Sequence, residues 1–173
     1  MDDFLERLES HDWLGEPSSP GEELERVAPA LAAAWRDETG AYEMLMRALG
    51  NRHEDAWFPV LLSAMPFLQA VIERGPGAGA HDAIYLLRCF CNTFSIALED
   101  SAPGMALEDS APDPDLEWAQ IVETGAQREL AFDDALEILV PTLARIKASI
   151  RADAEEAAGL LVAIGGRRRR RLR

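Results

Sequence analysis

Three segments of this sequence carry a Pro-x-Leu pattern within apolar, helix-like surroundings, and this recurrence limits the fold more than any other feature. The prolines are Pro29, Pro66 and Pro141, which lie 37 and then 75 residues apart. One period of about 40 residues, followed by about two, is typical of chains that stack pairs of helices on one another. Proline inside a helix costs about 3 kcal/mol, so its return at one place in the repeat predicts a shared kink.

Helical periodicity continues through the rest of the sequence, whereas the apolar-polar alternation of a strand is nearly absent. Turn residues such as Gly and Pro separate the helical segments. The expected helices span residues 2–8, 22–35, 41–49, 56–74, 83–98, 116–130, 133–150 and 153–164. We therefore predict an all-α fold of about seven to eight helices, in a single repeat domain that covers residues 1–164.

Two segments are expected to lie outside the helices. Residues 97–103 recur identically as residues 106–112, inside a stretch rich in Pro, Ser and acids. We interpret residues 99–115 as a mobile acidic loop, and the duplication as a neutral event in a tolerant surface loop rather than a functional one. Residues 165–173 place six arginines after a Gly-Gly pair and are expected to form a flexible Arg-rich tail.

The charge of the chain is strongly negative and unevenly distributed. Its 31 acidic and 17 basic residues give a net charge of −14, and residues 1–166 alone carry −20 because six arginines lie beyond them. A body this acidic repels phosphate, so direct binding of nucleic acid by the folded part is not expected. Three interpretations of the arginine tail stay open: contact with nucleic acid, contact with anionic lipid or, most simply, attraction to the acidic body.

Motifs of catalysis or metal binding are not found in the sequence. His11, His53 and His81 each precede an acid, which suits the capping of a helix start better than a metal site, because zinc-motif spacing is missing. No phosphate-binding loop or nucleophile elbow is present. Cys89 and Cys91 point about 200° apart on a helix, so we expect free, buried thiols in a reducing compartment. We expect no catalytic residue, no metal and no cofactor.

The location of the protein is predicted from two segments. The longest uncharged run, residues 56–72, contains Pro59 and Pro66 and predicts a buried helix rather than a membrane span. The first residues are acidic, where an export signal needs a basic region followed by an apolar one. A cytoplasmic protein without a membrane span is the expectation.

One stretch of the chain resembles a known family. Residues 48–60 read ALGNRHEDAWFPV and residues 63–68 read SAMPFL. This combination of a helix ending near Gly-Asn, a short polar turn with a histidine and an Ala-x-Pro-Phe-Leu helix resembles bacterial HEAT-repeat-like proteins, over residues 42–91. The resemblance implies a short right-handed HEAT-like α-solenoid. Many small proteins that look like this are found as immunity or accessory proteins beside secreted toxins, so it also implies a role in protein binding.

Acids crowd the expected helix starts and turns. Because the turns of a solenoid line up along an edge, these charges predict a negative ridge that would orient a basic protein, for instance a nuclease-type toxin. Trp57 and Trp118 follow acidic clusters and are candidate anchors. The equally weighted alternative is that the charge serves solubility and that both tryptophans belong to the core. The candidate partner-binding residues are Asp37, Glu38, Glu54, Asp55, Trp57, Asp113, Asp115 and Trp118.

These observations favour a binding protein over an enzyme. The concrete hypothesis is an immunity protein that neutralises a basic bacterial toxin by covering its active site or substrate groove. A general adaptor or regulatory scaffold is the alternative within the binding class. An enzyme of unknown type is the alternative from another class, and it would need a pocket in which His53 and His81 converge with carboxylates.

Overall fold

The computed structural model describes residues 3–16, 24–51, 56–100 and 114–171. Apart from turns and one minimal strand pair, these residues are helical, which confirms the predicted all-α fold. Two short 3-10 turns, Trp13–Gly15 and Leu24–Arg26, precede α2, and strand β1 (Gly50–Asn51) pairs antiparallel with β2 (Ala56–Trp57). The helices are α1 (Asp3–Ser10), α2 (Val27–Trp35), α3 (Ala41–Leu49), α4 (Val60–Arg74), α5 (Ala78–Asp100), α6 (Pro114–Lys147) and α7 (Ala154–Arg171).

Several helix boundaries differ from the expectation: α2 begins at Val27 rather than at residue 22, and α5 begins at Ala78 rather than at residue 83. Two further differences have a local cause. Helix α6 runs unbroken through residues 131–132, where the sequence predicts a break between two helices. No Gly or Pro stands between Leu130 and Asp133, so nothing in the backbone chemistry ends the helix there. Helix α4 begins at Val60 rather than at residue 56, because Ala56 and Trp57 pair with β1.

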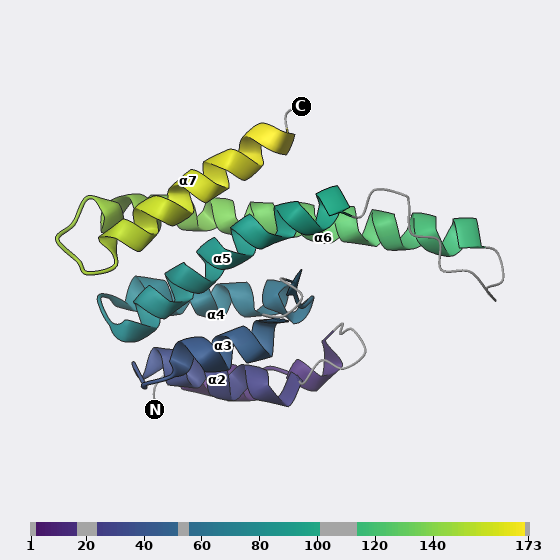
Figure 1. Cartoon of the computed structure of the whole chain (residues 1–173). Helices are drawn as coiled ribbons and strands as arrows, with labels where there is room; N and C mark the ends of the chain where they lie inside the picture. The colour runs from purple at the N-terminus through teal and green to yellow at the C-terminus, as the bar shows by residue number, and fades with distance from the viewer. Residues whose placement is uncertain (1–2, 17–23, 52–55, 101–113, 172–173) are drawn as a thin grey trace.

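The six longer helices form three successive hairpins, each packed against the next. Helix α2 pairs with α3, α4 with α5, and α6 with α7 (Figure 1). The first helices of the hairpins contact one another in the order α2, α4, α6, and the second helices do so in the order α3, α5, α7. Helix α1 packs on α2 and α4 and so covers the first hairpin.

The Pro-x-Leu segments occupy equivalent places in these hairpins. Each proline is in the first helix of its hairpin. Pro66 and Pro141 lie inside α4 and α6, whereas Pro29 lies in the first turn of α2, where proline is tolerated, so the prediction of a kink shared by all three helices does not extend to α2. The leucine of each segment is fully buried, with 0% of Leu31, Leu68 and Leu143 exposed. The repeat read from the sequence therefore marks the helices of one row, and its leucines face the core.

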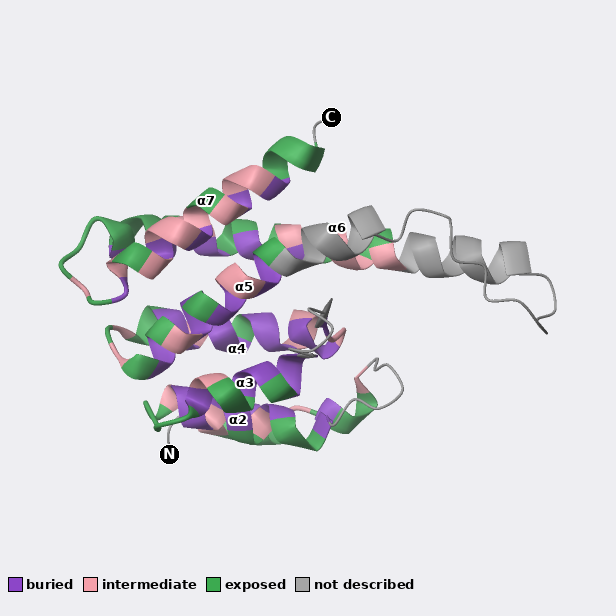
Figure 2. Ribbon diagram, viewed as in Figure 1, coloured by how far each residue is buried: buried purple, intermediate pink, exposed green. Residues whose placement is uncertain are grey.

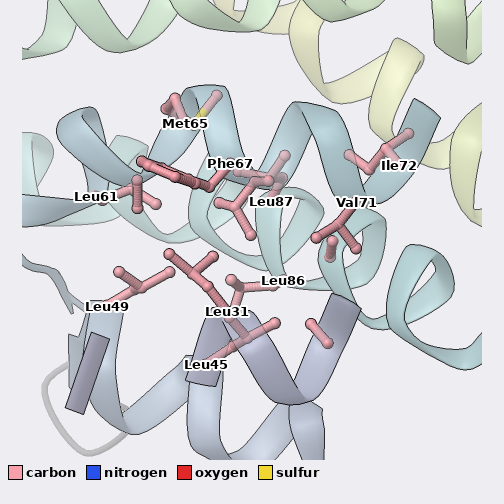
Figure 3. Packing of buried hydrophobic residues seen from close by; sticks show 14 of the residues in the cluster. Leu31, Leu45, Leu49, Leu61, Met65, Phe67, Val71, Ile72, Leu86 and Leu87 are labelled. Atoms are coloured by element: carbon pink, nitrogen blue, oxygen red, sulfur yellow. The ribbon is translucent and has the colours of Figure 1, made fainter. Parts of the chain in front are cut away.

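The core runs between the hairpins. Buried residues gather along the facing sides of the helices (Figure 2), and between the first two hairpins Leu31 and Leu45 meet Leu86 and Leu87 (Figure 3). Phe4 of α1 closes this end by stacking on Trp35, with ring centroids 4.0 Å apart. None of the helices, within the residues described, combines the length and the apolar character that crossing a membrane requires.

The two cysteines lie on α5 as thiols; Cys89 is half-buried, although both were expected to be buried. Cys91 is buried, and this burial raises the pKa of its thiol to about 12. Such a thiol stays protonated at neutral pH, so Cys91 packs as a small apolar residue rather than acting as a nucleophile.

Two arginines connect the turns of successive hairpins. Arg74, at the end of α4, donates to the Trp35 carbonyl and pairs with Asp37, with 3.2 Å between Nη1 and Oδ2. Arg151, before α7, donates to the Gly75 carbonyl at 3.0 Å and pairs with the buried Asp153. Each arginine thus ties its own hairpin to the turn of the hairpin before it.

Helix α5 begins against the end of α2 at a contact that only glycine permits. A Cβ added to Gly79 would lie 1.7 Å from the Ala34 carbonyl oxygen, which is a backbone atom that cannot move aside. The absence of a side chain therefore lets the second hairpin approach the first closely.

Helix α7 continues through Gly165 and Gly166 to Arg171, where the sequence predicts a flexible tail from residue 165. Arg167 is only 6% exposed, its Nε donates to Asp133 Oδ1 at 2.5 Å, and its guanidinium lies over the Phe132 ring. Two glycines cost a helix about 2 kcal/mol. Charge-assisted bonds to α6 and the favourable place of arginine at a helix C-terminus offset that cost. The expected attraction to the acidic body is realised here.

We predict that Gly79→Ala destabilises the protein by about 2–4 kcal/mol, because the new methyl group has no space beside Ala34. Gly165→Ala is the matched control: it is also helical, and nothing lies within 4 Å of the position that its Cβ would take, so we expect a gain of about 0.5–1 kcal/mol. Urea unfolding followed by circular dichroism measures both. Equal effects of the two substitutions would contradict the close contact.

We predict that Arg167→Ala costs about 2–3 kcal/mol, because it leaves Asp133 and Glu129 without their cation and uncovers Phe132. Arg168→Ala removes the same charge from an exposed neighbouring position, and its effect is expected to stay within about 0.5 kcal/mol. Thermal unfolding of the two variants provides the comparison. A flexible tail would make the two substitutions equivalent.

Candidate functional site

Asp37 lies in the turn that precedes α3, and its side chain connects this turn to the start of α5. Its backbone is left-handed, with a φ of 55°. Its Oδ1 accepts the Gly79 N–H at 2.8 Å, while its Oδ2 faces Arg74. The first N–H groups of a helix lack partners within the helix, so Asp37 supplies one for the start of α5.

Asp82, in turn, caps the start of α3. It lies in the first turns of α5, and its Oδ2 accepts the N–H of Tyr42, the second residue of α3, at 3.2 Å. Desolvation raises the pKa of the Asp82 carboxyl, the nearby charge of Asp37 raises it further, and His81 and the Tyr42 N–H act in the opposite direction. The starts of α3 and α5 therefore cap each other through two aspartates.

The same contact brings two tyrosines together on the surface. Tyr42 of α3 and Tyr85 of α5 have ring centroids 5.3 Å apart, and Tyr85 is 39% exposed. The exposed carboxylates of Glu38 and Glu43 lie just before and within the first turn of α3. Tyrosine combines a large contact area with little loss of side-chain freedom on binding, which suits a protein interface. We name this surface the acidic corner, and it consists of Asp37, Glu38, Tyr42, Glu43, Asp82 and Tyr85.

The structure places two of the predicted site residues in the acidic corner. Asp37 caps the start of α5, and Glu38 is exposed, with its Oε1 3.7 Å from Nη1 of Arg36. Asp115 and Trp118 belong to α6, in a part for which only the backbone is described. Three predicted residues, Glu54, Asp55 and Asp113, lie outside the described residues.

Trp57 lies in the core. It is 7% exposed and packs on Phe132, with ring centroids 5.1 Å apart. This position agrees with the alternative interpretation, in which Trp57 is a core residue rather than a surface anchor. Its strand pairs with Gly50, immediately after α3, whereas Asp37 stands before α3. The helix has nine residues, so it separates the two predicted positions by about 13 Å along its axis.

The predicted ridge stays a prediction, because Glu54, Asp55 and Asp113 lie outside the described residues, but the ends of the hairpins limit which turns can share an edge. Successive turns of stacked hairpins alternate sides: the turn after α2 and the turn after α4 share one end, as the bond from Arg74 to Asp37 requires. The connection after α3 lies at the other end. In the described part of the chain, alternate turns therefore share an end of the stack and consecutive turns do not.

Four members of the acidic corner are not among the binding residues predicted from the sequence: Tyr42, Glu43, Asp82 and Tyr85. The interpretation of Asp82 as a capping acid is correct, but it caps α3 rather than its own helix. Tyr42 and Tyr85 are 43 residues apart, about one repeat period, and this spacing is the signal in the sequence that connects them.

The residues that could bind a metal ion or line a cavity do not coincide with the acidic corner. No group of three His, Cys, Asp or Glu side chains is placed to hold a metal ion within the residues that the structure describes. His81 is exposed next to Asp82, while His53 lies outside those residues. A cavity of about 450 Å³ lies between α6 and α7, lined by Asp133, Leu136, Glu137, Ile164, Arg167, Arg168 and Arg171. It brings together charged and apolar groups without histidine.

We predict that Asp82→Ala costs about 1 kcal/mol of stability, because the Tyr42 N–H loses its acceptor. Asp82→Asn retains an oxygen acceptor and removes the desolvated charge, so it is expected to equal or exceed the wild type at pH 7. The raised pKa means that the folded wild type holds this proton more tightly than the unfolded chain. The advantage of the Asn variant should therefore shrink as the pH falls and Asp82 becomes protonated; urea unfolding from pH 7 to pH 4 tests this, and a pH-independent difference would contradict it.

Comparison with known proteins does not assign a function to the acidic corner. No protein-family model, no curated protein and no solved structure matches this chain. The resemblance to HEAT-repeat-like proteins at residues 42–91 stays a prediction.

Proposed function

We propose that this chain is a short HEAT-like α-solenoid that binds another protein and that, in concrete form, it is a cytoplasmic immunity protein that neutralises a basic bacterial toxin. The solenoid proposal draws on the three hairpins and on the two rows in which their helices contact one another. The binding proposal draws mainly on one observation. A tyrosine pair at the surface stands among four acids on two helix starts that cap each other.

The acidic corner is suited to recognition because its parts are held in place before a partner arrives. The two aspartates are already bonded to backbone N–H groups, so their positions do not have to be ordered on binding. Tyr85 is in contact with Tyr42 and remains accessible. Tyrosine is one of the residues that are enriched at binding hot spots, and a tyrosine that is held in place in advance loses little freedom on binding.

The charge of the chain favours a basic partner. The chain carries a net charge of −14 even with the arginines of α7 included, and this field accelerates the approach of a cationic protein at low ionic strength. Toxins that cleave nucleic acid hold phosphate with arginine and lysine. In the proposed complex Glu38 and Glu43 pair with such cations while Tyr85 packs against the toxin surface. The substrate of the toxin is then excluded from its groove.

A general adaptor with a different partner is the alternative that uses the same surface. The two proposals differ in what happens when the partner is produced alone. A toxin partner stops growth, and its co-expression with this chain restores growth, whereas the partner of an adaptor has no such effect.

The test is capture of the tagged full chain from its native host, at low salt and at about 0.5 M salt, followed by mass spectrometry and growth assays of the retained protein. We expect a stoichiometric basic protein that is toxic alone and harmless when co-expressed. Glu38→Lys with Glu43→Lys should slow association at least about tenfold, and Tyr85→Ala should weaken binding about tenfold. Glu6→Lys with Glu9→Lys makes the same charge change on exposed positions of α1 and serves as the control. Retention of only salt-labile nucleic acid, or equal effects of both double variants, would overturn the proposal.

A further inference from the structure

The last hairpin has an outer face that the described chain leaves uncovered. Helix α6 packs mainly on α4 and α7, and α7 mainly on α5 and α6, and no described helix packs on this hairpin from the other side as α4 and α5 pack on the first hairpin. Four of the seven most exposed large apolar side chains in the described residues belong to this hairpin: Leu130, Ile138, Ile150 and Val162. Exposed apolar groups that gather at the end of a helical stack are typical of a surface that a capping element or a partner covers.

The centre of this face is apolar. Ile138 of α6 is 61% exposed and Val162 of α7 is 71% exposed. The two helices run in opposite directions (Figure 1), and the bond from Arg167 to Asp133 sets their register. Ile138 is five residues after Asp133, and Val162 is five residues before Arg167. Because the helices are antiparallel, Ile138 and Val162 therefore lie at the same level along them.

Helix α7 has a stripe of outward-facing residues centred on Val162. Residues at equal distances before and after Val162 are similar in size, and those at the two ends of the stripe carry opposite charges. At helical spacing, four residues before and after Val162 are Ala158 and Gly166, and seven residues before and after it are Glu155 and Arg169. Glu155 and Arg169 are exposed, and a Cβ at Gly166 would have nothing within 4 Å. The stripe therefore allows close approach at its centre and carries opposite charges at its ends.

We propose that this face binds a second copy of the chain in a two-fold symmetric dimer, with α7 antiparallel to α7 of the other copy. A two-fold axis through Val162 places Glu155 of each copy against Arg169 of the other, so that two ion pairs flank an apolar centre. The same axis brings Ile138 of both copies together. A surface that is complementary to itself is the requirement for such an interface, and this stripe meets it.

The size of the face indicates a weak dimer. Helix α7 has 18 residues and is about 27 Å long, and two helices side by side are about 20 Å wide. The contact then buries on the order of 500 Å² per copy, which is at the lower limit of specific interfaces. Dissociation in the micromolar range is expected, with weaker association at high salt because the flanking pairs are exposed.

Sedimentation equilibrium of the full chain from about 1 to 500 µM, in low salt and in about 0.5 M salt, tests the dimer. We expect a reversible monomer-dimer equilibrium that shifts toward monomer with salt. Val162→Asp should weaken it at least about tenfold, whereas Leu14→Asp, at a position 75% exposed near the N-terminus, should leave it unchanged. A monomer throughout, or equal effects of the two substitutions, would overturn the proposal.

A charge exchange between copies tests the arrangement itself. Glu155→Arg alone and Arg169→Glu alone each set like charges opposite one another, so each variant should be monomeric. A mixture of the two restores both pairs and should form a heterodimer, and the double variant should again form a homodimer. Circular dichroism of each variant verifies that α7 stays helical. Failure of the folded variants to associate when mixed would refute the antiparallel contact.

Discussion

The structure depends on how closely the second hairpin approaches the first. Gly79 lies against the end of α2, and this contact brings Asp37 within reach of the start of α5 and Asp82 within reach of the start of α3. Each helix start then receives the acceptor that it cannot supply for itself. The Tyr42 and Tyr85 rings meet on the surface only because these two helix starts are held together. The candidate binding surface is thus a direct result of a backbone contact in the interior.

Much of the architecture was open to prediction from local patterns. Helical periodicity, turn residues and the spacing of Pro29, Pro66 and Pro141 indicate helices in repeated pairs, because these signals depend on residues near one another in sequence. Leu31, Leu68 and Leu143 are all fully buried, each in the first helix of its hairpin. The prediction was wrong at residues 165–171, because two glycines and a run of arginines indicate a flexible tail unless the acids of α6 are known to lie beside them.

The acidic corner was less open to prediction for the same reason. Asp37 and Glu38 are identified by their place in an acidic turn, which is a local property. The roles of Asp82 and Tyr85 depend on α3, which is about 40 residues away in sequence, and no local pattern reports that contact. Trp57 was ambiguous because an aromatic residue after acids suits a surface anchor and a core residue equally well. Its burial against Phe132 follows from the position of α6.

The two arginines that join successive turns both reach toward the N-terminus. Arg74 binds the turn that follows α2, and Arg151 binds the turn that follows α4. On the ribosome, each acceptor carbonyl is therefore synthesised before the arginine that binds it. A hairpin that emerges later meets a completed docking site on the hairpin before it, so the stack can assemble in the order of its synthesis, without waiting for the C-terminus.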